Sequence, residues 1–144
     1  MKKRWMVIGP AFCGKTSLID SLTGNRPLKP SRQDVIYTDQ AIDVPGMYIE
    51  NSMLHQRLIS LSQGASHVLF LIEKTGSLDV YPPGFAGVFT CPVIGVVTKA
   101  DTIAKDNHIG QSQWKYIGVK QPVYNVDTKT NLGIEELRRR LISS

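Results

Sequence analysis

The sequence predicts an α/β fold in which helices cover both faces of a mostly parallel, six-stranded sheet. Short runs of β-branched and other apolar residues recur along the chain, and stretches with helical spacing lie between them. Strands that are buried on both faces read as continuous apolar runs. With 144 residues, 42% of them hydrophobic, the chain can bury one core, and we expect a single domain over residues 1–144.

Six apolar runs are the expected strands. The two shortest, at residues 35–37 and 41–44, are close enough in the chain to pair with each other as neighbours. The other four alternate with helical segments, as in βαβ units, and lie at residues 5–8, 68–72, 93–97 and 123–126.

Helical spacing indicates helices at residues 15–22, 53–62, 109–116 and 134–142. In the last of these, two acidic residues stand in the first turn, where they oppose the positive end of the helix dipole. Trp114 and Tyr116 have apolar spacing, so we expect both in the core. Residues 24–34 and 75–87 are rich in proline, glycine and polar residues and are expected loops.

Composition excludes several classes of protein. No apolar run approaches the ~20 residues that cross a bilayer, so we expect no membrane segment. The basic residues at the start of the sequence are followed by a glycine motif rather than a signal-peptide cleavage site. The two cysteines are too widely spaced for a metal-ligand pair, and we interpret them as free thiols. We therefore expect a cytoplasmic protein. The net charge of +5 comes without an aromatic, basic stripe, which argues against a nucleic-acid partner.

A phosphate-binding loop follows the first expected strand. Its residues fit the pattern of glycine, four residues, glycine, lysine and serine or threonine, which arises by accident in roughly one chain in a few hundred. Backbone N–H groups and the start of a helix would surround a triphosphate, Lys15 would bridge its β- and γ-phosphates, and the Thr16 hydroxyl would bind Mg²⁺. The residues expected at the phosphates are Gly9, Pro10, Ala11, Phe12, Cys13, Gly14, Lys15, Thr16 and Ser17.

Cys13 allows two interpretations. A thiol beside Lys15 and a helix start would have a lowered pKa and would be reactive. The simpler interpretation is a small loop residue, and we favour it.

A carboxylate lies near the end of the third apolar run, at the edge of the sheet where we expect the nucleotide. Asp43 lies near the end of the run at residues 41–44, just before a Pro-Gly turn, so we expect it to face Mg²⁺ through a water molecule. Gly46 could offer its backbone N–H to the γ-phosphate. We therefore expect Lys15 and Asp43 to carry the chemistry, and Thr16 and Asp43 to hold the metal.

A base-binding segment follows the expected strand at residues 93–97. Ligands of open α/β sheets bind at the carboxyl ends of strands, and Thr98, Lys99 and Asp101 stand at such an end. The Asp101 carboxylate can accept two hydrogen bonds from the N1–H and N2–H₂ edge of guanine, and the Lys99 stem can lie along the base. Adenine presents an acceptor at N1, so this site would favour GTP over ATP.

The order and spacing of these three motifs resemble the Ras-like, translation-factor-related class of P-loop GTPases. More narrowly, the chain resembles the EutP/PduV family of ethanolamine- and propanediol-utilisation proteins. This resemblance covers essentially the whole chain and rests on the short distance from Thr16 to Asp43 and on three stretches, residues 42–51 (IDVPGMYIEN), 81–86 (YPPGFA) and 93–101 (VIGVVTKAD).

The resemblance implies a Ras-like fold, a link to bacterial microcompartments and an acetate kinase activity for some members. The chain departs from the family at three places. Arg32 aligns with the usual threonine of the first switch, and Met47 stands where a glutamate usually follows the glycine. In the last guanine loop, Asp127 and Thr128 replace the usual Ser-Ala and are expected near the base.

Three functions remain open. The first is a guanine-nucleotide switch that acts by binding a protein partner, with a microcompartment protein as the candidate, and that hydrolyses GTP slowly because Met47 cannot orient water. The second is an ATP-dependent acetate kinase, in which acetate takes the place of the attacking water. The third is a scaffold that has kept the fold and lost efficient turnover.

Overall fold

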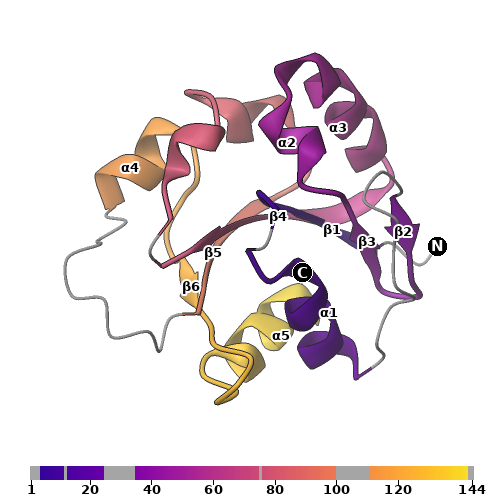
Figure 1. Cartoon of the computed structure of the whole chain (residues 1–144), viewed down its shortest axis with the longest axis vertical. Helices are drawn as coiled ribbons and strands as arrows, with labels where there is room; N and C mark the ends of the chain where they lie inside the picture. The colour runs from indigo at the N-terminus through magenta and orange to yellow at the C-terminus, as the bar shows by residue number, and fades with distance from the viewer. Residues whose placement is uncertain (1–3, 12, 25–34, 75, 100–110, 143–144) are drawn as a thin grey trace.

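A computed structural model gives the fold and describes residues 4–11, 13–24, 35–74, 76–99 and 111–142. A six-stranded sheet crosses its centre in the order β2-β3-β1-β4-β5-β6 (Figure 1). β2 pairs antiparallel with β3, and the other neighbouring pairs are parallel, which confirms the predicted sheet. The strands are β1 (Arg4–Ile8), β2 (Ile36–Tyr37), β3 (Ala41–Asp43), β4 (Ala65–Glu73), β5 (Val93–Thr98) and β6 (Tyr124–Asn125).

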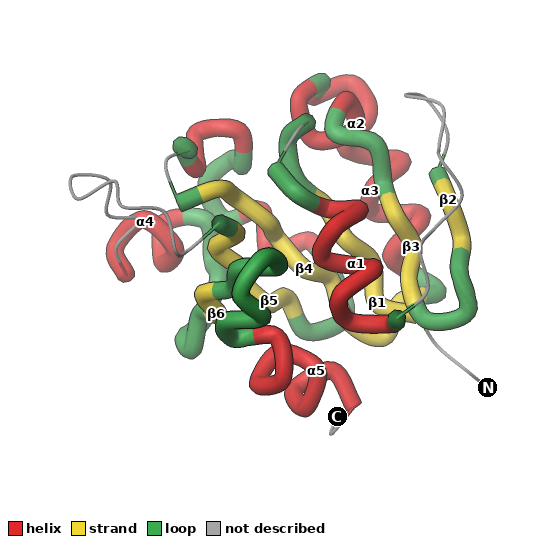
Figure 2. The backbone as a smooth tube through the Cα atoms, turned by 60° about the horizontal axis from the view of Figure 1, so that its bottom comes forward, coloured by secondary structure: helices red, strands yellow, loops and turns green. Residues whose placement is uncertain are grey.

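Helices cover both faces of the sheet. α1 and α5 lie on one face, whereas α2, α3 and α4 lie on the other (Figures 1 and 2). None of the helices in the described ranges is long and apolar enough to span a membrane. The α-helices are α1 (Lys15–Thr23), α2 (Met47–Glu50), α3 (His55–Ser62), α4 (Gln111–Tyr116) and α5 (Ile134–Ile142), and the 3₁₀ turns are η1 (Ser52–Leu54), η2 (Leu78–Val80) and η3 (Phe85–Val88).

The buried core forms two clusters, one on each face of the sheet. Successive side chains of a strand point to opposite faces, so Met6 packs in one cluster and Val7 in the other. The same alternation divides Phe70 from Leu71 in β4. These strands are apolar at nearly every position because both of their faces are covered, as the sequence indicates.

The proline-rich segment after β4 contains short 3₁₀ turns, and its aromatic residues join the core. The Tyr81 ring stacks on Phe70 with centroids 4.6 Å apart, and Phe85 contacts both Phe70 and Phe89. The Tyr81 hydroxyl donates a hydrogen bond of 2.6 Å to the Leu71 carbonyl. The YPPGFA stretch therefore fixes the segment against the end of β4.

Two features near α2 and α3 differ from the sequence prediction. The expected helix at residues 53–62 begins as the turn η1, where the Asn51 side chain accepts a 3.0 Å hydrogen bond from the Met53 N–H before α3 starts at His55. The four residues of α2 lie outside the predicted helices. One turn of helix is too short to show a period, although Tyr48 and Ile49 are buried.

The expectation that two aromatic residues of α4 lie in the core is half right. Trp114 is fully buried, and a Cβ atom on Gly95 of β5 would lie only 2.8 Å from its ring. Tyr116 is wrong as a core residue, because 67% of its surface is exposed. Residues two apart on a helix point in directions about 200° apart, so only one of the pair can face the sheet.

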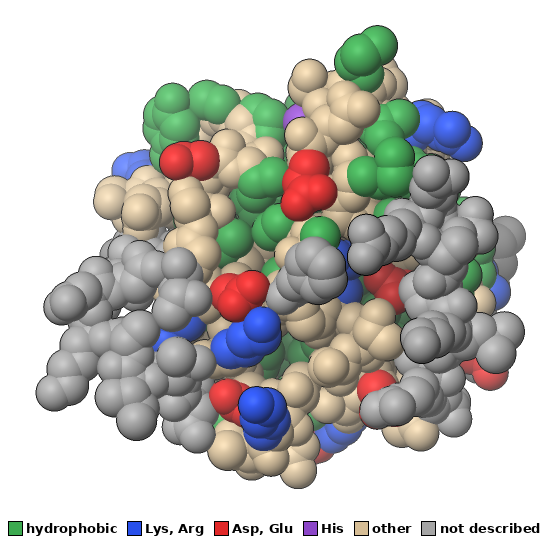
Figure 3. All heavy atoms as spheres, viewed as in Figure 1, with side chains coloured by type: hydrophobic (Ala, Val, Ile, Leu, Met, Phe, Trp, Pro, Cys, Tyr) green, Lys and Arg blue, Asp and Glu red, His purple; other side chains and the backbone are tan. Residues whose placement is uncertain are grey.

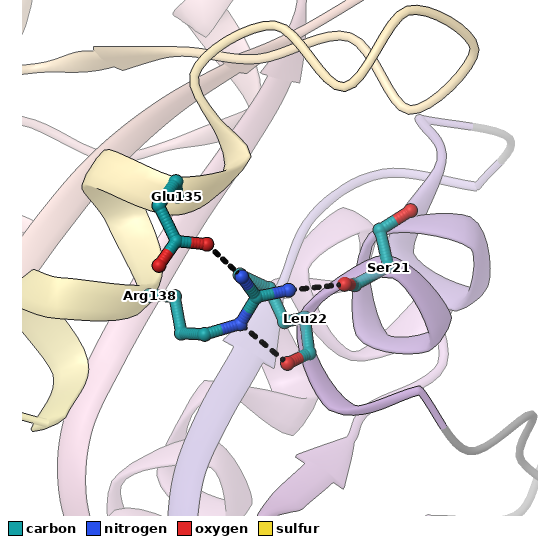
Figure 4. A network of polar contacts seen from close by, with 4 residues as sticks. All are labelled: Ser21, Leu22, Glu135 and Arg138. Atoms are coloured by element: carbon teal, nitrogen blue, oxygen red, sulfur yellow. Dashed lines mark hydrogen bonds and ion pairs between the residues drawn. The ribbon is translucent and has the colours of Figure 1, made fainter.

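Arg138 of α5 braces the end of α1 (Figure 4). Its Nε and Nη2 atoms donate to the carbonyls of Leu22 and Ser21 at 3.1 and 2.8 Å, while Nη1 pairs with Glu135. The last carbonyls of a helix have no partner within the helix, so Arg138 satisfies two of them. This contact fixes the helix that begins in the phosphate loop against α5.

Replacing Arg138 tests this brace. Arg138→Ala should lower the free energy of unfolding by about 1–2 kcal/mol, because two hydrogen bonds from a charged donor are lost. The adjacent Arg139 is exposed, so Arg139→Ala should change the same quantity by less than about 0.5 kcal/mol. Urea unfolding of both variants gives the comparison, and equal effects would show that Arg138 does not support α1.

Candidate functional site

The candidate site lies where β1, β3 and β5 end. The phosphate loop follows β1, Asp43 is the last residue of β3, and Thr98 is the last residue of β5. β1 pairs with β3 on one side and with β4 on the other, so the strands that follow β1 in the chain lie first on one side of it and then on the other. Open α/β sheets bind ligands at such a reversal of strand order.

The phosphate loop is closed around the Lys15 side chain. Lys15 Nζ donates hydrogen bonds to the carbonyls of Gly9 and Pro10 at 3.0 and 3.1 Å, which places the ammonium across the loop. Gly14 caps α1 with φ of 95°, a conformation that favours glycine. The loop thus brings a cation and the start of a nine-residue helix together, the combination that attracts a phosphate.

Thr16 and Asp43 meet beside the loop. The Thr16 hydroxyl donates to Asp43 Oδ2 at 3.3 Å. Asp43 is 5% exposed, and burial raises its pKa, while the Lys15 charge and the Thr16 hydrogen bond partly oppose that shift. A hydroxyl and a buried carboxylate at this distance offer the hard oxygen ligands that Mg²⁺ prefers.

The same pair fits a metal that also binds phosphate oxygens. Within the described ranges, no three His, Cys, Asp or Glu side chains gather into a group that could hold a metal ion. Mg²⁺ usually takes one or two protein ligands and completes its shell with water and substrate phosphates. Thr16 and Asp43 therefore suit Mg²⁺ carried with a triphosphate better than a metal held by protein ligands alone.

Thr98 ties the end of β5 to the phosphate loop. Its hydroxyl, buried with the rest of the side chain, donates to the Cys13 carbonyl at 2.6 Å. Lys99 follows in the left-handed region with φ of 55°, and its ammonium lies 3.2 Å from Glu73 Oε2. The segment expected to bind the base thus starts next to the phosphate loop, and Asp101 lies outside the described residues.

The turn after β6 lies beside this segment. The Val126 N–H donates to the Val97 carbonyl at 2.8 Å, which brings Asp127 close to the end of β5. Asp127 Oδ1 accepts hydrogen bonds from the backbone N–H groups of Lys129 and Thr130 at 2.8 and 3.3 Å. The carboxylate therefore shapes its own turn, while Thr128 is partly exposed.

The structure decides between the two interpretations of Cys13. The thiol is 1% exposed, and burial raises its pKa, an effect that outweighs the opposing charge of Lys15. A thiolate is the reactive form of cysteine, so the reactive-thiol interpretation is wrong. Cys13 packs inside the loop, where a Cβ atom on Gly9 would lie only 2.6 Å from its sulfur.

Gly46 packs directly on the phosphate loop. A Cβ atom at this position would lie 2.4 Å from the backbone nitrogen of Ala11, so only glycine fits without a shift of the backbone. This contact places the start of α2 against Ala11. Phe12 of the phosphate loop lies outside the described residues, as does Arg32, which aligns with the usual threonine of the first switch.

Two carboxylates at the site were missed in the sequence. Glu50 Oε2 accepts a 3.2 Å hydrogen bond from the Ala11 N–H of the phosphate loop, and Glu73 pairs with Lys99. Glu73 could have been found as the last residue of the strand next to β5. No pattern in the sequence indicates that Glu50 lies at the site, because its position depends on the short helix α2.

Basic residues do not gather on the face drawn in Figure 3. There the Lys and Arg side chains of the described residues are interspersed with Asp and Glu. Nucleic-acid-binding proteins usually present a continuous basic stripe. This face gives no support to a nucleic-acid partner.

Sequence comparisons match the chain to proteins named for ethanolamine and propanediol utilisation. A family model described as "Ethanolamine utilisation - propanediol utilisation" matches residues 1–143. The "Propanediol utilization protein PduV" of Citrobacter freundii is 32% identical over 135 residues, which span 94% of this chain and 90% of that protein. The "Probable acetate kinase EutP" of Salmonella typhimurium is 26% identical over 137 residues, spanning 94% and 86%.

Structural comparisons agree on the fold. A probable GTP-binding protein engB superposes with a TM-score of 0.70 at 18% identity, covering 97% of both chains. The FeoB G-domain of Methanococcus jannaschii gives a TM-score of 0.65 at 20% identity, covering 98% of this chain and 96% of that one. The chain therefore has the fold of P-loop GTPases, as the sequence predicts.

The buried charge of Asp43 leads to a prediction about stability. Asp43→Asn should raise the free energy of unfolding of the nucleotide-free protein at pH 7 by about 1 kcal/mol, because an amide is buried at lower cost than a carboxylate. The pKa of Asp43 is raised in the folded state, so protonation removes this cost. The gain should therefore shrink as the pH falls through the raised pKa toward the ordinary value of 3.8.

Urea unfolding at pH 7 and at acidic pH measures this effect. Asp39 is exposed in the turn between β2 and β3, so Asp39→Asn is the matched control and should change stability little at either pH. A loss of stability in Asp43→Asn at pH 7 would contradict the burial cost.

Proposed function

The chain belongs to the ethanolamine utilisation and propanediol utilisation family, and from this membership and its site we propose that it is a Mg²⁺-dependent, guanine-nucleotide-binding protein with slow GTPase activity. The observation that carries the proposal is the meeting of Lys15, Thr16 and Asp43 at one edge of the sheet. We propose that residues 1–144 act as one domain.

The roles of these residues follow from their positions. Lys15 exchanges its bonds to the Gly9 and Pro10 carbonyls for bonds to the β- and γ-phosphates, and the N–H groups at the start of α1 hold the phosphate charge. Thr16 and Asp43 hold Mg²⁺, which neutralises charge on the phosphate oxygens when it is bound. Gly46 stands beside Ala11, where its N–H can face the γ-phosphate.

Guanine selectivity rests on the segment after β5 in this proposal. The ion pair with Glu73 holds the Lys99 stem at the end of the sheet, in position to lie along the base. Asp101 accepts the two donors of the guanine edge, and the turn at Asp127 and Thr128 lies on the other side of the base. Each lost hydrogen bond to a charged group would cost about 1.5–3 kcal/mol.

Slow hydrolysis follows from Met47. In the family it stands where a water-orienting glutamate usually follows the glycine, and its thioether is a poor hydrogen-bonding group. The side chain is 38% exposed at the start of α2. We therefore propose a protein that stays in its GTP state for long periods and acts by binding a partner.

Two other functions compete with this proposal. The "Probable acetate kinase" named among the relatives favours phosphoryl transfer between ATP and acetate, with Lys15 holding the transferred group. Met47 favours a scaffold without efficient turnover. We propose a cytoplasmic location, with the partner at a bacterial microcompartment for ethanolamine or propanediol metabolism.

Nucleotide binding separates these functions. We expect mant-GTP with Mg²⁺ to bind more tightly than mant-ATP. Lys15→Ala should weaken binding of mant-GTP on the order of 100-fold, since a charged contact to two phosphates is lost. Lys115 is exposed on α4, so Lys115→Ala is the control that should bind normally.

Asp101→Asn tests the guanine assignment. Binding of mant-GTP should fall on the order of 100-fold, whereas binding of mant-ATP should not change, because only guanine donates two hydrogen bonds to the carboxylate. A preference for ATP that Asp101→Asn leaves intact, with ATP turnover that requires acetate, would instead support the kinase. Tight GTP binding with no hydrolysis at all would support the scaffold.

A further inference from the structure

Glu50 stands at the edge of the phosphate loop without a role in the functions above. It is the last residue of α2, and its carboxylate oxygen Oε2 lies 3.2 Å from the backbone nitrogen of Ala11. A second contact supports the hydrogen bond between Glu50 and Ala11. Gly46, the residue before α2, packs so closely on Ala11 that the whole turn of helix is held against the loop.

The position of Ala11 shows where the carboxylate lies relative to a bound triphosphate. The N–H groups that receive phosphate charge are those at the start of α1, around Gly14, Lys15 and Thr16. Ala11 lies in the first half of the loop and is exposed. Glu50 can therefore keep its place at the mouth of the loop while phosphates fill the part next to α1.

The other carboxylates of the site are engaged elsewhere. Asp43 accepts the Thr16 hydroxyl and is buried beside the expected metal position. Glu73 is paired with Lys99 at the end of β5. Met47, on the same turn of helix as Glu50, offers only a thioether. Among these groups, Glu50 combines a carboxylate with a position at the open side of the loop.

We propose that Glu50 is the general base of GTP hydrolysis, a role that rests on the proposed GTPase function. A water molecule in front of the γ-phosphate donates a hydrogen bond to the Glu50 carboxylate. Its oxygen forms a bond to the γ-phosphorus, and the bond between that phosphorus and the β–γ bridging oxygen breaks. The bridging oxygen keeps the electron pair, and the water proton passes to Glu50 and then to the released phosphate.

The contact with the phosphate loop prepares the Glu50 carboxylate for proton transfer. The Ala11 N–H holds the carboxylate in place, so the base is oriented before water attacks.

Single-turnover hydrolysis and mant-GTP binding, measured on the same variants, test this role. Glu50→Gln should slow hydrolysis on the order of 100-fold while mant-GTP affinity stays that of the wild type, since the amide cannot accept the proton. Glu50→Asp keeps a carboxylate but shortens the side chain by one methylene, so its hydrolysis rate should lie between those of the wild type and Glu50→Gln. Glu136 is exposed on α5, so Glu136→Gln makes the same chemical change away from the site. This matched control should hydrolyse GTP at the wild-type rate.

Chemical rescue separates a base from a structural contact. In Glu50→Ala, added formate should restore part of the hydrolysis rate, because a small carboxylate can occupy the vacated place beside Ala11. Acetamide can accept the Ala11 hydrogen bond in the same place but cannot accept the water proton, so it should not restore the rate; equal rescue by acetamide would show a structural contact.

Three results would overturn the inference. Normal affinity with normal hydrolysis in Glu50→Gln would reject Glu50 as the base and leave the proposed GTPase function intact. Tighter binding or faster hydrolysis in that variant would show that Glu50 obstructs the γ-phosphate. Failure of the wild-type protein to bind GTP would reject the proposed function and this inference together.

Discussion

The parallel pairing of β1 with both β3 and β4 is the constraint on which the rest of the structure depends. Val7 lies opposite Asp43 in one pair, and Ile8 lies opposite Phe70 in the other. Parallel strands end at the same edge, so the phosphate loop and the Asp43 carboxylate meet there although 27 residues separate Thr16 from Asp43. Pairing of β4 with β5 extends the edge to Thr98. The site is thus a consequence of strand register.

Hydrogen bonds from buried hydroxyl groups join these strands to the segments beside them. Tyr81 donates to the Leu71 carbonyl, and Thr98 donates to the Cys13 carbonyl, each at 2.6 Å. Burial raises the pKa of Tyr81 well above its ordinary value, so the phenol keeps the proton that it donates. Each such bond contributes about 1 kcal/mol, and its loss would leave a polar group buried without a partner. Tyr81 thus fixes the segment after β4 to that strand, and Thr98 fixes the phosphate loop to the end of β5.

Sequence patterns predicted the sheet because its physical cause is local: strands buried on both faces must be apolar. They predicted the phosphate loop in part because Gly14 takes a left-handed conformation that favours glycine. The sequence patterns missed α2 because one helical turn has no measurable period. They placed Tyr116 in the core wrongly, because apolar spacing does not reveal which side of α4 faces the sheet. Cys13 has charged neighbours in sequence, but its burial depends on tertiary packing. Glu50 was invisible for the same reason, since it reaches Ala11 only through the fold of α2.

The central claim is that one edge of the sheet binds Mg²⁺ and guanine nucleotide together. A crystal structure of the protein grown with Mg²⁺ and equal amounts of non-hydrolysable GTP and ATP analogues tests it most directly. The account predicts the GTP analogue, with its phosphates between Gly9 and Thr16, Mg²⁺ beside Thr16 and Asp43, and guanine against Lys99 and Asp101. An adenine nucleotide in the loop, or a loop that binds neither analogue, would contradict it.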